Sequence, residues 1–358
     1  MRAAQQGGSG LTTGGIMPAR RIPFNVFGIP FGLAGLAGVW LTAARQGYTS
    51  VVVGNVLAVA AAAVWCLVVF YFLRYAVGSP RAARQDFIDP VLSPFASLFC
   101  IIPMLLSAVA LGPYAHTSAV VLVDIFLVIT FALGAWFTGQ WIYGPLTIEN
   151  LHPGYFLPTV AGGFVAAASA GVVGQTQVAR LMFGLGLICW VILGSMILGR
   201  LFFGPPLPPP LVPTLAIEVA PAAVATMAYV AAFGPQVDGM VVGLAGYGLL
   251  MVASQFRLVP MFMKLPFFAS FWAFTFSWAV VVSAVLYWIE QQRVPGATVY
   301  VYALLALLTL SYVALGIRTG VALARGNLFP APATTNAASS GEQRAKRVRR
   351  QQDGEQQR

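Results

Sequence analysis

Residues 51–76 read VVVGNVLAVAAAAVWCLVVFYFLRYA, and this stretch decides the class of fold. No charged side chain occurs in it before Arg74. A helix needs about 20 mostly apolar residues to cross the hydrocarbon core of a bilayer. The run is continuously apolar and does not alternate in the way that strands of a membrane barrel do. It therefore predicts a membrane-spanning helix.

Further runs of the same kind fill most of the chain. The 358 residues are 59% hydrophobic and only 8% charged, with a mean hydropathy of +0.81. A soluble protein carries about 25% charged residues, so a soluble enzyme, a secreted disulfide scaffold and a disordered protein are excluded. We predict an all-α polytopic membrane protein with ten spans, at 24–44, 51–76, 91–112, 118–138, 157–175, 178–200, 213–233, 239–258, 266–287 and 296–321.

The ten spans divide the chain into three parts. We expect residues 1–22 to be a disordered cytoplasmic tail, 23–325 to be the transporter or channel domain, and 326–358 to be a disordered basic cytoplasmic tail. No apolar segment with a cleavage pattern lies near the start, so we expect no signal peptide. The basic run at 344–350 suits contact with anionic membrane lipid, or else it is a solvated tail.

The basic residues predict the orientation. Only Arg45, Arg180 and Arg293, of 20 basic residues, lie on the side away from the termini. Without the distal tails the count is still ten against three. Basic residues favour the cytoplasmic side, so both termini are predicted to be cytoplasmic in a bacterial-type inner membrane. The net charge of +10 is then explained by the orientation of the chain in the membrane, and we expect no nucleic-acid partner.

Residues for soluble chemistry are scarce. Cys66, Cys100 and Cys189 lie within predicted spans without CxxC spacing, and His116 and His152 are the only histidines. The phosphate-binding pattern GxxxxGK[ST] is absent, which argues against an ATP-driven pump. We therefore expect no catalytic residue, no metal and no cofactor.

Prolines separate the spans into two classes. The odd-numbered spans contain Pro30, Pro103, Pro158 and Pro221, and the even-numbered spans contain none. A proline frees a backbone carbonyl one turn earlier, which within a membrane must pair with protein or water. We therefore expect five helical hairpins with the odd-numbered helices around a central pore. The alternative is that prolines are simply common in membrane helices.

Few polar groups lie inside the spans. Glu218 lies one turn before Pro221 and is either linked to proton movement or held in a helix–helix hydrogen bond. An aromatic ring of the ninth span could plug a narrow pore, although such rings also pack or face lipid. Hydroxyls could line the path or bond back to their own helix; the candidates are Ser107, Thr159, Ser169, Thr226, Thr275 and Ser283.

Five segments carry a family resemblance. They are 23–37 (PFNVFGIPFGLAGLA), 152–161 (HPGYFLPTVA), 216–222 (AIEVAPA), 246–248 (GYG) and 271–277 (FWAFTFS). In this order the chain resembles the tellurite-resistance/dicarboxylate transporter family of TehA-like proteins, fungal malate transporters and the slow anion channels of plant guard cells. The resemblance covers roughly 23–325.

The resemblance implies a ten-helix barrel, usually a homotrimer, that passes small inorganic or carboxylate anions without a cofactor. It implies a pore gate at Phe276, or failing that Phe274. It also implies pore-lining or kink positions at Gly28, Pro30, Phe31, Gly32, Pro103, Ser107, Pro158, Thr159, Pro221, Thr226 and Thr275.

Two positions depart from the family pattern. Asp89 stands where the family often has histidine, and Glu218 stands where bacterial relatives are commonly uncharged. The added carboxyl raises an alternative to an anion channel, which is a proton-coupled carrier of C4-dicarboxylates or monocarboxylates.

Overall fold

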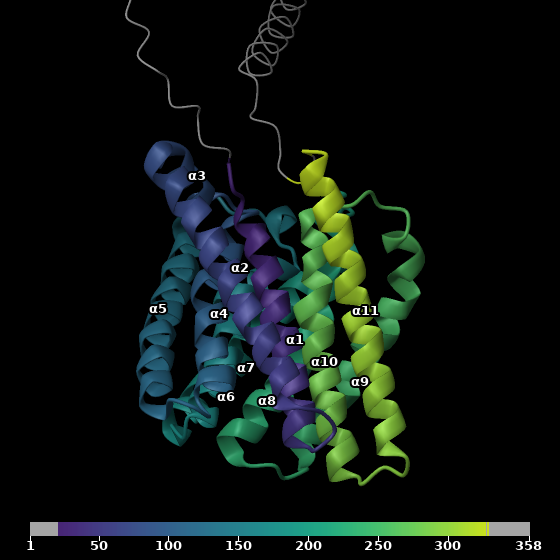
Figure 1. Cartoon of the computed structure of the whole chain (residues 1–358). Helices are drawn as coiled ribbons and strands as arrows, with labels where there is room; N and C mark the ends of the chain where they lie inside the picture. Colours follow the sequence, from purple (N-terminus) through teal and green to yellow (C-terminus); the bar gives the residue numbers. More distant parts are fainter. Residues whose placement is uncertain (1–20, 327, 329–358) are drawn as a thin grey trace, which may run out of the picture.

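The computed structural model of this protein describes residues 21–326 and 328. All regular elements in this part are helical, and ten helices are long and apolar enough to cross a membrane (Figure 1). The prediction of ten spans is confirmed. The first and last described helices reach the same end of the bundle (Figure 1). Most of the two predicted tails lies outside the described residues.

The odd-numbered spans form a ring of mutual contacts. Their main helices touch in the closed order α1, α4, α6, α8, α10 and back to α1. Each of these spans combines an α-helix with 3-10 or π segments. Their parts are η1 (Phe24–Phe27) with α1 (Gly28–Arg45); η2 (Ser93–Ser97), α4 (Leu98–Leu106) and η3 (Ser107–Leu111); η5 (Pro153–Tyr155), η6 (Leu157–Ala161) and α6 (Gly162–Val172); η7 (Val212–Val219) with α8 (Ala220–Phe233); and η8 (Ala269–Trp272) with α10 (Ala273–Gln291).

The even-numbered spans are single uninterrupted α-helices. They are α2 (Val51–Gly78), α5 (His116–Tyr143), α7 (Thr176–Phe203), α9 (Gly239–Phe262) and α11 (Ala297–Ala324). Each contacts the odd-numbered span before it and the next span of the ring: α2, for example, packs against α1 and α4, and α11 against α10 and α1. For α9 the contact with α10 includes aromatic pairs, among them Phe256 with Trp278. The even-numbered helices therefore cover the seams of the ring.

Burial separates the two classes without overlap. Among the odd-numbered spans, 50–78% of the most apolar window is buried inside the protein, against 17–28% among the even-numbered spans. Because apolar side chains on the outside of a membrane protein contact lipid tails that are as apolar as they are, both classes can be equally apolar. We call the odd-numbered spans the inner helices and the even-numbered spans the outer helices.

Most of the inner prolines lie at the start of a helical segment rather than at a kink within one. Pro30, Pro158 and Pro221 lie in the first turns of α1, η6 and α8. Pro103 alone lies inside its helix, and it leaves the carbonyl of Phe99 without its usual donor. Trp65 of α2 donates its indole N–H to that oxygen at 3.1 Å. An outer helix thus satisfies the carbonyl that an inner proline frees.

The prediction that the even-numbered spans lack proline was wrong. We expected the eighth span to end at 258, but α9 continues to Phe262 and contains Pro260. The residue is exposed and lies in the last turn of the helix, where a distorted hydrogen-bond ladder costs little.

A short helix, α3 (Pro80–Ile88), lies between α2 and η2 and was not predicted. Asp86 on its inner face is buried and accepts hydrogen bonds from Tyr75 and Arg21. The Nη2 atom of Arg21 lies 2.5 Å from Asp86. The hydrogen bond to Asp86 raises the pKa of the Arg21 guanidinium. This ion pair anchors the chain just before the first span.

Candidate functional site

A cavity lies where the inner helices begin. Its volume, measured as the space open to the centres of water-sized molecules, is about 50 Å³. All of its described lining residues belong to the five inner spans, and none of them is charged. They are Asn25, Gly28, Phe31, Phe95, Leu98, Phe156, Leu157, Val160, Ala161, Phe164, Ile217, Ala220, Pro221, Val224, Ala269, Ser270, Trp272, Ala273, Phe276 and Ser277.

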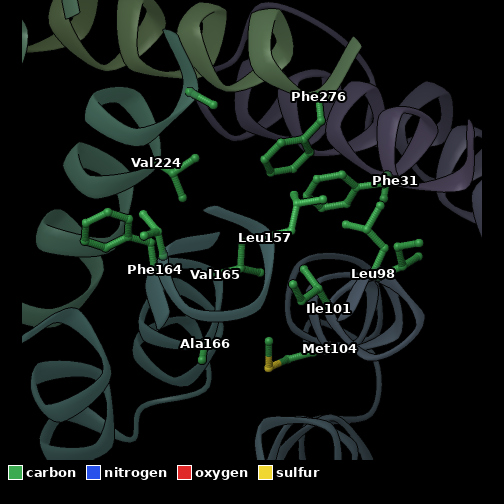
Figure 2. Packing of buried hydrophobic residues seen from close by; sticks show 14 of the residues in the cluster. Phe31, Leu98, Ile101, Met104, Leu157, Phe164, Val165, Ala166, Val224 and Phe276 are labelled. Carbon is green, nitrogen blue, oxygen red and sulfur yellow. The ribbon is translucent and has the colours of Figure 1, made fainter. Parts of the chain in front are cut away.

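Two stacked phenylalanines form part of the wall of this cavity. The rings of Phe31 and Phe276 lie nearly parallel, with centroids 3.7 Å apart and an interplanar angle of 17°. Both side chains are buried. Figure 2 shows the two rings pointing into the middle of the ring of helices, with Leu157 beside them and Val224 facing them. The phenyl pair therefore places two apolar rings among aliphatic side chains in the middle of the inner ring.

The first turns of the inner helices surround the cavity. Its lining comes from η1, η2, η6, η7 and η8 and from the α-helical turns that follow them. The N-terminus of a helix carries unpaired backbone N–H groups and a partial positive charge of roughly half a unit. Five such ends around one apolar cavity favour a negative occupant, although no cationic side chain lines the described wall.

Four of the predicted site residues meet at this cavity. Gly28 and Phe31 enter it from α1, Pro221 from α8 and Phe276 from α10. Phe274 does not line it, because its ring packs against Phe262 of α9 at a centroid distance of 4.9 Å. Of the two predicted gate positions, Phe276 therefore lines the cavity and Phe274 does not.

The remaining predicted positions lie elsewhere. The carbonyl of Gly32 accepts a hydrogen bond from Tyr312 of α11, and Thr275 bonds back to Trp272. Thr226 bonds back to Ala222. None of Pro30, Pro103, Pro158, Gly32, Thr226 and Thr275 is among the described lining residues.

Two further hydroxyls face outer helices. Ser107 bonds back to Pro103 and lines a surface groove beside α2. The methyl group of Thr159 lies beside Gly134 of α5, and its hydroxyl lies near Cys189 of α7. Neither side chain lines the cavity.

Glu218 is buried outside the cavity wall. Its side chain is only 6% exposed, and neither carboxyl oxygen makes a hydrogen bond within the described residues. Tyr247 of α9 is the ionisable group close enough to interact electrostatically with it. The carboxyl therefore belongs to the seam between η7 and α9 rather than to the wall of the cavity.

His152 holds the start of the fifth span in place. Its Nε2 atom lies 3.0 Å from the carbonyl oxygen of Val91, and its Nδ1 atom accepts from the Gly154 N–H. The ring also stacks on Phe95, which lines the cavity. Burial lowers the pKa of His152 to about 4, so the imidazole is neutral and joins the segments that lead into the third and fifth spans.

Sequence reasoning missed polar residues of the cavity, among them Asn25 and Ser277. Both fall within the segments that carry the family resemblance, at 23–37 and 271–277. Each is a polar residue among apolar neighbours, and this pattern could have marked both as candidate lining residues. Rotation about the helix axis, which decides where each one points, could not be read from the sequence.

Comparisons with known proteins agree with this architecture. Over 285 residues, 78% of this chain and 85% of the relative, it is 29% identical to the tellurite resistance protein TehA homolog of Haemophilus influenzae. Over 307 residues, 82% of this chain, it is 25% identical to the guard cell S-type anion channel SLAC1 of Arabidopsis thaliana. The match covers only 53% of the plant protein.

The family match extends over nearly the whole described region. Residues 21–320 match the SLAC1 family profile, whose description is voltage-dependent anion channel. The matched range includes all five inner helices and the cavity they enclose. The chain belongs to the SLAC1 family of voltage-dependent anion channels, a family of membrane anion channels and transporters.

Proposed function

We propose that this protein is a gated anion channel, in which anions cross the membrane through the ring of inner helices and Phe276 closes the path. The observation that carries the proposal is the apolar cavity that all five inner spans line, with the Phe31–Phe276 stack in its wall. An apolar constriction stops ions by excluding water. Displacement of the Phe276 ring would open a continuous path.

The electrostatics favour an anion over a cation. No acidic side chain lines the described wall, while five helix N-termini surround it. The exposed arginines Arg74, Arg81 and Arg84 lie near the same end of the bundle. Surface charges of one sign raise the local concentration of the opposite ion. Arginines concentrate anions at the mouth, and backbone dipoles stabilise them inside.

Phe276→Ala tests the gate. We expect the anion conductance of the variant in planar bilayers to exceed that of the unchanged protein by tenfold or more, because the path loses the ring that fills it. Phe274→Ala is the matched control on the same helix, since its ring packs away from the cavity. Equal currents from the Phe276→Ala variant and the unchanged protein, at equal amounts of reconstituted protein, would reject the gate.

Glu218 favours a second candidate function, the proton-coupled carrier of mono- or dicarboxylates. A buried carboxyl with no hydrogen bond within the described residues is costly to ionise and could exchange a proton during transport. In this case uptake of labelled malate would depend on a pH gradient and collapse in Glu218→Gln. A channel would instead show a reversal potential set by the anion gradient alone.

The proposed function includes a membrane, an orientation and an oligomeric state, all argued from the sequence. We place both termini in the cytoplasm of a bacterial-type inner membrane, with 23–325 as the transport unit. The family resemblance supports a homotrimer, and the unit needs neither cofactor nor catalysis. Labelling of Ser79→Cys and Gly296→Cys variants from either side of intact vesicles tests the orientation, because these residues lie in loops at opposite ends of the bundle.

A further inference from the structure

The cavity contains two polar side chains whose hydrogen-bonding capacity is unused. Asn25 lies in η1, and Ser277 lies one position after Phe276 in α10. Neither side chain makes a hydrogen bond to any described residue, and the Oδ1 atom of Asn25 is buried without a partner. Buried polar groups are nearly always paired. An unpaired amide and an unpaired hydroxyl in one cavity therefore call for a ligand.

Ser277 differs from the other hydroxyls of its helix. Thr275 and Ser283 both donate to carbonyls of their own helix, at Trp272 and Ala279. This back-bonding is the usual arrangement for such residues in helices. Ser277 does not adopt it, although its side chain is only 2% exposed. Its O–H remains available to a molecule inside the cavity.

The third polar residue of the cavity wall is already engaged. Ser270 donates its proton to the carbonyl of Pro210 at 2.6 Å. Trp272, which also lines the cavity, donates its indole N–H to Thr319 of α11. The side-chain donors that remain for a ligand on the described wall are therefore the amide of Asn25 and the hydroxyl of Ser277.

The surroundings of these two donors select the charge of the ligand. A buried cation needs an acid or another negative group to offset its charge, and no acid lines the described wall. The first turns of five inner helices add partial positive charge around the same space. We infer that Asn25 and Ser277 form a binding site for a small anion, which accepts hydrogen bonds from the Asn25 amide and the Ser277 hydroxyl before it passes the Phe31–Phe276 stack. The inference rests on the proposed anion pathway and names the side chains that hold its ion.

Anion binding can be tested without conduction. A ligand that binds only the folded state stabilises it in proportion to its affinity. In detergent, chloride and nitrate at constant ionic strength, with gluconate as the large control anion, should raise the melting temperature of the otherwise unchanged protein. Asn25→Leu preserves bulk and removes the donor, so the anion concentration for half of the shift should rise about tenfold, as for a lost hydrogen bond to a charge.

Ser277→Ala should weaken the same response several-fold, and Ser283→Ala is its matched control. Ser283 is on the same helix, has its hydroxyl bonded to Ala279, and does not line the cavity. An anion response that stays unchanged in both Asn25→Leu and Ser277→Ala overturns the site. A response that Ser283→Ala weakens equally also overturns it, because the effect would then not be specific to the cavity.

Conductance measurements separate this site from the proposed pathway. In a Phe276→Ala background, Asn25→Asp puts a carboxylate at the cavity, so anion current should fall and the chloride-to-sodium permeability ratio should drop by about tenfold or more. If Phe276→Ala conducts and Asn25→Asp leaves its current and ion preference unchanged, the site is wrong and the pathway stands. If Phe276→Ala carries no current while the anion-dependent stabilisation still requires Asn25, the site stands and the pathway is wrong.

Discussion

The inner and outer helices are all apolar enough to cross a membrane, but they differ in backbone regularity and in burial. The inner helices begin with 3-10 turns and bury at least half of their apolar windows, and two of them include a π segment. The outer helices are regular over 24–28 residues and bury little. Irregular backbone at membrane depth is tolerated where protein surrounds it. The inner ring can therefore hold irregular backbone because the outer helices shield it from lipid.

The first prediction contrasts two faces of one outer helix. A Cβ atom at Gly186 of α7 would lie 2.8 Å from the Phe164 ring and 3.0 Å from its backbone nitrogen. Gly186→Leu therefore has to push α6 away from α7, and overpacking of this kind costs about 1–3 kcal/mol or more. We expect loss of most folded protein in size-exclusion chromatography and a lower melting temperature.

Gly184→Leu is the control for this experiment. A Cβ atom there meets nothing within 4 Å, so folding should be unchanged. Equal yields of folded protein from the two variants would contradict the assignment of a packed face and a lipid face to α7.

The second prediction compares aromatic rings of the two classes. Phe31 stacks on Phe276 in the cavity, whereas Phe70 of α2 is exposed on the outer surface. Phe31→Ala should raise anion conductance severalfold, because the Phe276 ring loses its stacking partner and half of the plug is removed. Phe70→Ala should leave the current unchanged. Bilayer recording at matched protein density measures both, and a silent Phe31→Ala variant would place the barrier elsewhere.

The third prediction concerns the bond that an outer helix supplies to an inner one. Trp65→Phe removes the donor to the Phe99 carbonyl, and a buried acceptor without a partner costs about 1–3 kcal/mol. The melting temperature should fall. The double variant Pro103→Ala, Trp65→Phe should recover part of the loss, since an alanine in place of the proline restores a backbone N–H that can reach the Phe99 carbonyl.

Trp136→Phe controls for the loss of an outer indole, because Trp136 is exposed and makes no side-chain hydrogen bond in the described part. It should leave the melting temperature unchanged. A double variant no more stable than Trp65→Phe alone would show that the indole bond does not compensate for the proline.

The smallest expected effect is a pH dependence within the inner ring. The pKa of His152 falls from 6.5 to about 4 in the folded protein, so the unfolded chain binds more protons between these values. Stability from this group is therefore present above pH 6.5 and is lost as the pH falls towards 4. The melting temperature should decline over this range, and less steeply in His152→Gln. An identical decline in both proteins would assign the acid sensitivity to other groups.

Patterns in the chain allowed much of the fold to be predicted. Ten apolar runs, their order and the inner class of the odd-numbered spans follow from hydropathy and from Pro30, Pro103, Pro158 and Pro221. The short basic helix α3 was missed because apolar length was the signal used. The predicted eighth span ended at 258 and so left out Pro260, which α9 includes near its exposed end.

The site was only partly predictable. Gly28, Phe31, Pro221 and Phe276 meet at the cavity, but Thr159, Thr226 and Thr275 do not. In a soluble helix the apolar stripe reveals which face is buried. In a membrane helix both faces are apolar, so this signal disappears. Sequence reasoning could propose hydroxyls on the right helices but not the side of each helix that faces the pathway.

The amino-acid sequence by itself determined that this protein crosses a membrane ten times, which helices are inner and to which family it belongs. These features follow from free-energy costs that depend only on the order of residues in the chain. They are the cost of exposing an apolar run to water and the cost of freeing a carbonyl at a proline. Only the tertiary structure decided that Phe276 rather than Phe274 meets Phe31, that Glu218 lies outside the cavity, and that Asn25 and Ser277 point into it. Helix rotation is set by packing between neighbours, and packing exists only once the ring has closed.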